Sequence, residues 1–228
     1  MNELEVIVEG RTEKAFVQGQ LQEHLARHNV RAWASLPRKS GNQGGVPKWA
    51  AAKSVIINTL KERRFCSTMF DYYGMPSDWP GRQEASTKPW NERASFVEKR
   101  IHDVIVQEMG DKFDARFFIP YVQLHEFEAL MFADVRALAL SLSSLSGCAE
   151  EALIEEFTRI VSEVGHPEAI NDRYETCPSR RIKAIVPGYK KVAFGSIITS
   201  KIGIEVLRSR CSHFGEWLTR LEQLGAKV

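Results

Sequence analysis

Short apolar runs and amphipathic stretches alternate along the first part of the chain. The apolar runs that predict strands cover residues 4–8, 30–36, 64–70 and 115–124. The helices predicted between them, from apolar residues three or four positions apart, cover 12–28, a stretch from 47 onward, and 91–108. Strands that alternate with helices are typical of a mostly parallel sheet with helices on both faces. The sequence therefore predicts an α/β fold.

A different pattern begins near residue 134, where the spacing of apolar residues becomes mainly helical. Apolar stripes of this kind cover 153–164 and 214–224, and the stretch Ala193–Thr199 is expected to add a short strand. We therefore predict two parts. An α/β domain spans residues 1–135, and a mainly helical accessory region, a C-terminal annex over residues 136–228, packs on it.

Composition narrows the function classes only slightly. Of the 228 residues, 43% are apolar and 26% charged, and the formal net charge is +2, so any nucleic-acid surface must come from local clusters of Lys and Arg. The four cysteines form no Cys-x-x-Cys pair and are interpreted as reduced packing residues. We expect a cytoplasmic protein without a membrane segment, since no signal-peptide pattern is present and no apolar run approaches about 18 residues.

Acidic residues follow the predicted strands at the points where the strands end. Glu9 comes directly after the first strand with Glu13 one helical turn later, and Asp71 ends the third. Glu126 and Glu128 follow the last strand. Carboxylates gathered at the carboxyl edge of a sheet suit Mg²⁺ or Mn²⁺ and the hydrolysis of phosphoesters. The alternative is structural, with Glu13, Glu126 and Glu128 stabilising helix starts through the helix dipole.

The segment Val8-Glu9-Gly10-Arg11-Thr12-Glu13 resembles the first motif of the Toprim superfamily, the fold shared by topoisomerases, bacterial primases and OLD-family nucleases. The resemblance implies a Toprim-like sheet and a role for Glu9 in acid/base or metal chemistry. It also implies an Asp-x-Asp pair that binds Mg²⁺. Here Asp71 occupies the first position of that pair and Tyr73 the second, so Glu126, Glu128 or Asp78 would have to replace the missing ligand.

Further segments extend the resemblance over nearly the whole chain. Residues 123–130, 178–182 and 189–191 are similar to recurring segments of a narrower Toprim-like family of uncharacterised bacterial proteins. Members of that family are often encoded beside an ATPase and are suspected of roles in phage defence. The resemblance therefore implies a separately encoded ATPase as a partner that controls the activity.

Basic residues gather in two places that are candidates for binding nucleic acid. The first group comprises Arg180, Arg181, Lys183, Lys190 and Lys191. Ser179 is expected to cap a short helix there, whose first N–H groups would bind a phosphate. The second is the Gly-rich loop with Arg38 and Lys39, which lacks the order of a P-loop, so we expect no ATPase activity in the chain itself. An ordinary solvated basic surface explains the first group about equally well.

Two histidines one helical turn apart, His24 and His28, lack the glutamate of a His-Glu-x-x-His zinc motif, and we expect them on a solvated helix face.

The leading hypothesis for the function is a metal-dependent nuclease with catalytic residues Glu9, Glu13 and Asp71. Its metal ligands would be Glu9, Asp71, Glu126 and Glu128. The competing hypothesis, favoured by Tyr73, is a catalytically inactive Toprim module that binds nucleic acid or an ATPase as a sensor or scaffold. Nucleotidyl transfer ranks third, because no second nucleotide site is visible in the sequence.

Overall fold

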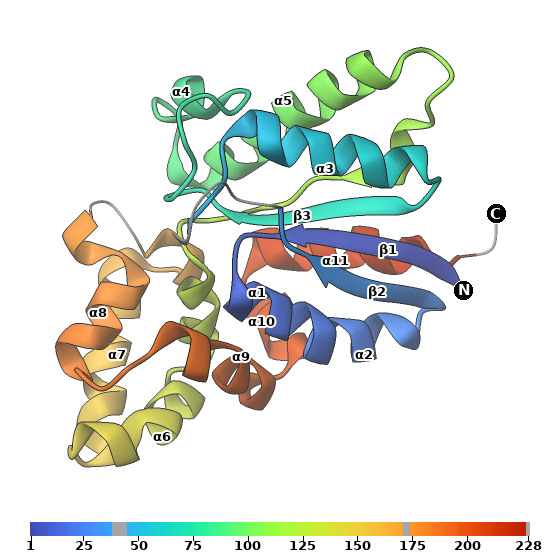
Figure 1. The fold of residues 1–228 in the computed structure, drawn as a ribbon. Helices are drawn as coiled ribbons and strands as arrows, with labels where there is room; N and C mark the ends of the chain where they lie inside the picture. Colours follow the sequence, from blue (N-terminus) through green and yellow to red (C-terminus); the bar gives the residue numbers. More distant parts are fainter. Residues whose placement is uncertain (38–44, 171–173, 227–228) are drawn as a thin grey trace.

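A parallel β-sheet lies at the centre of the computed structural model, which describes residues 1–37, 45–170 and 174–226 (Figure 1). The sheet has the strand order β2-β1-β3-β4, and β5 pairs with the end of β3. The strands are β1 (Asn2–Val8), β2 (Val30–Ser35), β3 (Phe65–Asp71), β4 (Phe118–Ile119) and β5 (Val122–Gln123). All pairings are parallel, so the carboxyl ends of β1 and β3 meet at one edge. The predicted α/β fold is confirmed.

Helices from the first half of the chain cover both faces of the sheet (Figure 1). The predicted first helix is a continuous helical run of α1 (Arg11–Phe16), a π-helical turn η1 (Val17–Leu21) and α2 (Gln22–Ala26). The helices on the opposite face are α3 (Trp49–Lys61) and α5 (Trp90–Met109), with the short α4 (Arg82–Ala85) beside them. Val6 and Val8 of β1 belong to the apolar core under α1 and α2, while Ile7 belongs to the core under α3 and α5. This alternation is what a strand buried on both faces requires.

The predicted strand over 115–124 is wrong as a single element. It consists of a 3-10 turn, η2 (Ala115–Phe117), followed by β4 and β5, with Pro120 between the two strands. Proline has no N–H to donate to a neighbouring strand, so the ladder is interrupted there. Side chains of β3 replace part of it. The Ser67 hydroxyl donates to the Ile119 carbonyl at 2.6 Å, and the Thr68 hydroxyl donates to the Tyr121 carbonyl at 2.9 Å.

The remainder of the chain is helical. Its elements are η3 (Phe127–Ala133), α6 (Val135–Ser146), α7 (Glu150–Val164), η4 (Pro167–Ala169), η5 (Tyr174–Thr176), α8 (Pro178–Ile185), α9 (Lys191–Ile202), α10 (Ile204–Arg210) and α11 (Ser212–Gln223). The strand predicted over 193–199 is wrong, since this stretch lies inside α9. Gly195, Ile198, Thr199 and Ile202 are its buried positions, and this spacing of three and four residues belongs to a helix packed along one side.

Helix α11 returns to the sheet and packs on the same face as α1 (Figure 1). The Trp217 indole N–H donates to the Ser67 hydroxyl at 2.9 Å, and the Trp217 and Tyr121 rings stack with centroids 4.3 Å apart.

The domain boundary predicted between residues 135 and 136 stays a prediction. No single helix in the described ranges is long and apolar enough to span a membrane, and the pair Phe127–Ala133 and Val135–Ser146, which meets the criterion jointly, is bent by 108°.

Candidate active site: a carboxylate cluster at the sheet edge

The carboxyl ends of β1 and β3 place Glu9 and Asp71 side by side. Glu9 is the first residue after β1, and its backbone N–H donates to the carbonyl of Met69 in β3 at 3.2 Å. In return, the backbone N–H of Asp71 donates to Glu9 Oε2 at 3.2 Å. Two residues far apart in sequence are therefore joined at the edge of the sheet, by a main-chain bond between their strands and by a bond from the Asp71 backbone to the Glu9 side chain.

Glu13 reaches the same edge from the first turn of α1. Its side chain is buried at 2% exposure, and it lies so close to Gly10 that a Cβ there would be 3.0 Å from Glu13 Oε2. Glu13 Oε1 and Asp71 Oδ1 are both buried, and neither has a hydrogen-bond partner within the described ranges. A buried carboxylate oxygen without a partner is costly, because it has lost its water without a replacement.

Glu128 and Lys191 complete the cluster from the helical part of the chain. The Lys191 ammonium lies 2.9 Å from Glu128 Oε2 and 3.3 Å from Asp71 Oδ2, so it bridges the two carboxylates. The Tyr189 hydroxyl donates to Glu128 Oε1 at 3.1 Å. Burial raises the pKa of the Tyr189 hydroxyl, with Glu128 adding to the effect, which keeps this donor protonated.

The electrostatics of the cluster are dominated by burial. Burial raises the pKa of Asp71 well above its usual value, and this outweighs the opposing effect of Lys191. The negative charges of Glu9 and Glu13 raise it further. Burial likewise raises the pKa of Glu128. Burial lowers the pKa of Lys191, but the charges of Asp71 and Glu128 outweigh this and hold the pKa well above its usual value. The cluster therefore holds more acidic groups than its lysine can neutralise.

This donor set fits a hard divalent cation. All the candidate ligand atoms are carboxylate oxygens, which Mg²⁺ and Mn²⁺ prefer. The oxygens of Glu13 and Asp71 that have no partner among the described residues are buried at one sheet edge. A cation bound there would lower the raised pKa of Asp71 and so favour its ionised form. The residues present thus fit the Mg²⁺ or Mn²⁺ site expected from the sequence.

The other acids considered from the sequence lie in different environments. Glu126 Oε2 accepts the backbone N–H of Ser179 at 3.0 Å. Asp78 Oδ2 accepts the backbone N–H of Trp49 at 3.1 Å, at the start of α3. Tyr73, at the position of the second aspartate, donates its backbone N–H to the carbonyl of His125 at 3.1 Å. Of the three acids considered as replacements for that aspartate, Glu128 contacts the Lys191 ammonium, which also contacts Asp71.

The basic residues expected to bind nucleic acid lie in three environments where the structure describes them. Arg180, Lys183 and Lys190 are exposed, and the first two line a shallow depression together with Glu175 and Ser179. Arg181 is paired with Glu163 at 2.9 Å and donates to the carbonyl of Thr176 at 3.0 Å. Lys191 belongs to the carboxylate cluster. Arg38 and Lys39 lie outside the described residues.

The expected capping of a helix by Ser179 is wrong. Helix α8 begins at Pro178 with Cys177 as its N-cap, and Ser179 is the second residue of the helix. The carboxylate of Glu126 accepts the N–H of Ser179, so a protein acid already occupies part of this helix start. The expectation that His24 lies on a solvated face is also wrong, because His24 is 7% exposed and packs against Glu222 of α11.

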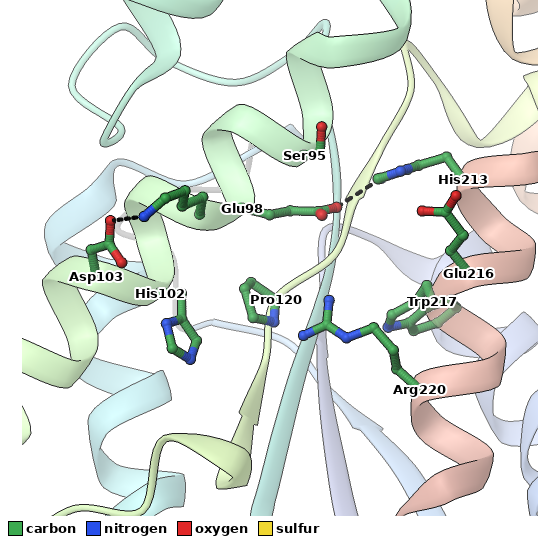
Figure 2. A pocket seen from close by; sticks show the side chains of 10 residues that line it. Ser95, Glu98, His102, Asp103, Pro120, His213, Glu216, Trp217 and Arg220 are labelled. Atoms are coloured by element: carbon green, nitrogen blue, oxygen red, sulfur yellow. Dashed lines mark hydrogen bonds and ion pairs between the residues drawn. The ribbon is translucent and has the colours of Figure 1, made fainter.

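A second feature, a cleft between α5 and α11, lies beside the edge strand β4 (Figure 2). Its volume is about 400 Å³, and Figure 2 shows side chains of both helices facing each other across it. His213 Nε2 lies 2.8 Å from Glu98 Oε1, which also accepts the backbone N–H of Val122 at 2.8 Å. Burial lowers the pKa of His213, but the charge of Glu98 and the hydrogen bond outweigh this and raise it.

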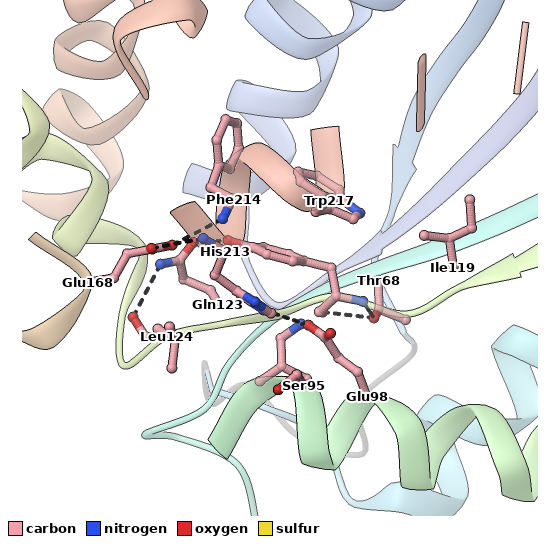
Figure 3. Close-up of polar contacts among 12 residues, drawn as sticks. Thr68, Ser95, Glu98, Ile119, Gln123, Leu124, Glu168, His213, Phe214 and Trp217 are labelled. Atoms are coloured by element: carbon pink, nitrogen blue, oxygen red, sulfur yellow. Dashed lines mark hydrogen bonds and ion pairs between the residues drawn. The ribbon is translucent and has the colours of Figure 1, made fainter. Parts of the chain in front are cut away.

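Next to His213, a buried glutamate holds the start of α11 (Figure 3). Glu168 is fully buried, and its carboxylate accepts the backbone N–H groups of His213 at 3.0 Å and Phe214 at 3.1 Å. These two bonds satisfy N–H groups that the first turn of a helix leaves without partners. This cleft and its support were not predicted from the sequence, because Glu98 and His213 are 115 positions apart, Glu168 and His213 are 45 positions apart, and these residues share no local motif.

Fold and site together define an α/β protein with a parallel sheet and a buried carboxylate cluster at the carboxyl edge of its central strands. The chain belongs to the family described as a domain of unknown function, DUF4276, whose model matches residues 8–222.

A solved structure similar to the chain is the C-terminal region of the OLD protein of Xanthomonas campestris pv. campestris. The TM-score is 0.46 with 11% sequence identity, and the match covers 97% of this chain and 95% of that one. No curated protein matches the chain.

Proposed function

We propose that the protein is a Mg²⁺- or Mn²⁺-dependent nuclease that hydrolyses phosphodiester bonds of DNA or RNA. The observation that carries the proposal is the convergence of Glu9, Glu13, Glu128 and Lys191 on Asp71, with buried oxygens of Glu13 and Asp71 that have no hydrogen-bond partner among the described residues. Such an arrangement is costly for a metal-free protein, and a functional role accounts for it better than stability does. The resemblance of residues 8–13 to the first Toprim motif supports the same assignment.

Each side chain has a role that follows from its place in the cluster. Asp71, Glu13 and Glu128 would hold the cation, with Glu9 as a further ligand or as the acceptor of a proton from the attacking water. Glu126 contributes less, since one of its oxygens already accepts the N–H of Ser179. A bound Mg²⁺ or Mn²⁺ ion supplies Lewis acidity toward a phosphoryl oxygen and lowers the pKa of a water molecule.

Lys191 is the cation that the chain itself supplies. Its side chain is 34% exposed, and its ammonium contacts Asp71 and Glu128. A phosphodiester approaching the cluster would meet this charge, which would reduce the repulsion between the phosphate and the carboxylates. Arg180, Lys183 and Lys190 would bind the nucleic-acid backbone farther from the reacting phosphate.

The partners of this activity follow from the family resemblance. A separately encoded ATPase would bind the protein and control cleavage, and the pair would act against phage in the cytoplasm. The sequence of the chain supports this division of labour, since it contains no P-loop motif of its own.

The test is cleavage of labelled plasmid, single-stranded DNA and RNA by purified protein in Mg²⁺, Mn²⁺ or EDTA, with and without a co-encoded ATPase. Glu9→Gln and Asp71→Asn are expected to reduce metal-dependent cleavage by at least about 100-fold while nucleic-acid binding persists. Asp78→Asn is the matched control, because Asp78 contacts the backbone of Trp49 instead of the cluster. Equal loss of activity in all three variants would refute the assigned roles.

A second candidate function is a catalytically inactive Toprim module that serves as a sensor or scaffold. Two observations favour it. Tyr73 stands where a second aspartate is expected, and the Lys191 ammonium already neutralises part of the charge of Asp71 and Glu128. Mn²⁺ binding followed by calorimetry separates the two functions, because the nuclease requires binding that Asp71→Asn abolishes. Absence of both Mn²⁺ binding and cleavage, with salt-sensitive nucleic-acid binding intact, would establish the scaffold.

A further inference from the structure

A cluster of two imidazoles and a carboxylate joins α2 to α11, away from the acids of the candidate active site. His24 Nε2 lies 2.6 Å from Glu222 Oε1, and His28 Nε2 lies 3.6 Å from the same oxygen. The ligand atoms that His24, His28 and Glu222 offer all lie within 4.8 Å of one another. Two nitrogen donors and one oxygen donor thus converge on a point between the two helices.

We propose that His24, His28 and Glu222 form a binding site for a transition-metal ion, with Zn²⁺ as the best match to this donor set. Imidazole nitrogens with one carboxylate oxygen suit Zn²⁺ and Co²⁺, whereas Mg²⁺ prefers oxygen donors alone. Three protein ligands leave the fourth position of a tetrahedral ion to water. The site is independent of the proposed nuclease, since it shares no residue with the carboxylate cluster.

The distances of the two histidines from Glu222 require only small adjustments to hold the ion. Bond lengths near 2.0–2.2 Å place the ligand atoms of a tetrahedral zinc site roughly 3.4 Å apart. The separation of 3.6 Å between His28 and Glu222 is close to this value, and the hydrogen bond of 2.6 Å between His24 and Glu222 would lengthen as the ion replaces its proton. The His28 side chain is 41% exposed, so water can reach the open side, while His24 and Glu222 are 8% and 12% exposed.

Two further groups lie close to these ligands. The carboxylate of Glu205 lies 3.8 Å from His24 Nδ1, on the ring nitrogen that does not face Glu222. A carboxylate that accepts a hydrogen bond from the second ring nitrogen is the usual arrangement that orients a histidine ligand, and Glu205 would have to move closer to form that bond. Gly225, just after α11, lies against the His28 carbonyl with no room for a Cβ, so the two segments are packed at backbone contact.

Arg208 is the group that competes with a metal for this site. Its guanidinium contacts Glu222 Oε1 and lies 3.4 Å from His24 Nε2. The Glu222 carboxylate thus contacts both a guanidinium and an imidazole on the same oxygen. In the metal-free protein Arg208 supplies the positive charge, and metal binding would displace it toward Glu205, whose Oε2 lies 3.4 Å from Arg208 Nε.

The test is titration of chelator-stripped protein, carrying no histidine tag, with CoCl₂ and with ZnCl₂. Co²⁺ is the informative probe, because four-coordinate tetrahedral Co²⁺ gives an intense visible absorption that six-coordinate Co²⁺ on carboxylate and water oxygens lacks. We expect about one Co²⁺ per chain with this absorption, displaced by Zn²⁺. The titration is repeated in Asp71→Asn, where the absorption is expected to persist because the carboxylate cluster is a separate site.

Substitutions then locate the ion. His24→Gln and His28→Gln are expected to weaken Co²⁺ binding at least about tenfold, whereas His102→Gln, a histidine of the α5–α11 cleft, leaves it unchanged. Arg208→Gln is expected to tighten binding by removing the competing cation. His28→Gln keeps the test valid if the buried His24 variant does not fold.

Absence of the absorption in the wild type would overturn the proposal, even if Arg208→Gln acquired it, because the arginine would then exclude the metal. Binding that survives both histidine substitutions would overturn it as well.

Discussion

Lys191 and Asp71 are 120 positions apart in the sequence, and in the folded chain the Lys191 ammonium lies 3.3 Å from an Asp71 carboxylate oxygen. The same ammonium contacts Glu128. The cation is carried by the first residue of α9 and the acid by the last residue of β3, so the relationship depends on how the helical part of the chain packs on the sheet edge.

Replacing this lysine should show how much of the acidic charge it neutralises. Lys191→Met is expected to lower the free energy of unfolding by about 1–3 kcal/mol at pH 8 in EDTA, because the buried carboxylates lose their counter-ion. The loss should shrink at pH 5, where those carboxylates can take up protons. Lys190→Met, an exposed neighbour, should stay within about 0.5 kcal/mol in the same urea unfolding experiment. Equal effects of the two substitutions would contradict the bridge.

Neutralising Asp71 should stabilise the metal-free protein. Its pKa is raised, so the native state holds a proton that the unfolded state has released once the pH exceeds the ordinary value of 3.8. The stability of the metal-free protein therefore falls as the pH rises from there to the pKa of the folded state. Asp71→Asn should remove this part of the slope and raise the unfolding free energy at pH 8 by about 1 kcal/mol in EDTA. Mg²⁺ should raise the melting temperature of the wild type and leave that of the variant unchanged.

Gly195 should be sensitive to the smallest substitution. A Cβ at this position would lie 2.5 Å from Thr12 Cγ2, so α9 would have to move away from α1, and Lys191 would move with it. Gly195→Ala is expected to cost about 1–3 kcal/mol of stability. It should also weaken Mg²⁺ binding at the cluster. Gly188→Ala is the control, since its Cβ would make ordinary contacts of 3.7 Å and 3.8 Å with Leu145. A stable Gly195→Ala protein with normal Mg²⁺ affinity would contradict the close packing.

The His213–Glu98 pair should make stability depend on pH near neutrality. Because the pKa of His213 is raised in the folded state, the contribution is complete below the ordinary value of 6.5 and is lost as the pH rises through the raised pKa. In the wild type, the unfolding free energy should fall by about 1 kcal/mol as the pH rises above 6.5, and His213→Gln should remove this fall. His102→Gln should keep the wild-type slope. The measurement is urea unfolding at a series of pH values, and an unchanged slope in His213→Gln would count against a charged pair.

The exposed basic residues should contribute to nucleic-acid affinity through counter-ion release. The double variant Arg180→Gln/Lys183→Gln is expected to reduce the slope of log affinity against log salt concentration by roughly 1.5–2. Arg181→Gln should leave the slope nearly unchanged, because Arg181 is paired with Glu163 and the carbonyl of Thr176. Fluorescence anisotropy with a labelled oligonucleotide measures both. If the salt dependence of affinity falls equally in the double variant and in Arg181→Gln, Arg181 binds phosphate despite its pairing with Glu163.

The first half of the fold could be predicted because local patterns and tertiary packing agree there. β1, β2 and β3 are apolar runs, and a parallel arrangement brings Glu9 and Asp71 to one edge without knowledge of any contact. The stretch 193–199 misleads, since its β-branched residues have high strand propensity, yet packing against η3 and α1 makes it a helix. Composition alone does not encode that contact.

The contacts of Lys191 with Asp71 and Glu128 could not be predicted from the sequence, for a related reason. Beside Lys190 in a basic stretch, it has the pattern of a surface residue that binds phosphate. Its inward position is set by the neighbours of α9, including the close contact of Gly195 with Thr12. One local signal was available: Tyr189 and Lys191 flank the exposed Lys190 and share a side, and a tyrosine on that side indicates burial. The His24–Glu222 contact has no such signal, because α11 lies almost two hundred residues later.

The position of Lys191 late in the chain has a consequence for protein synthesis. The acids of the cluster are all translated by residue 128, whereas their counter-ion is translated only at residue 191. Domains fold as their residues emerge from the ribosome, so a nascent chain that ends before α9 carries the acids without the lysine that neutralises them. The complete α9 brings Lys191 to Asp71 and Glu128, so a chain that ends before α9 cannot form the assembled cluster.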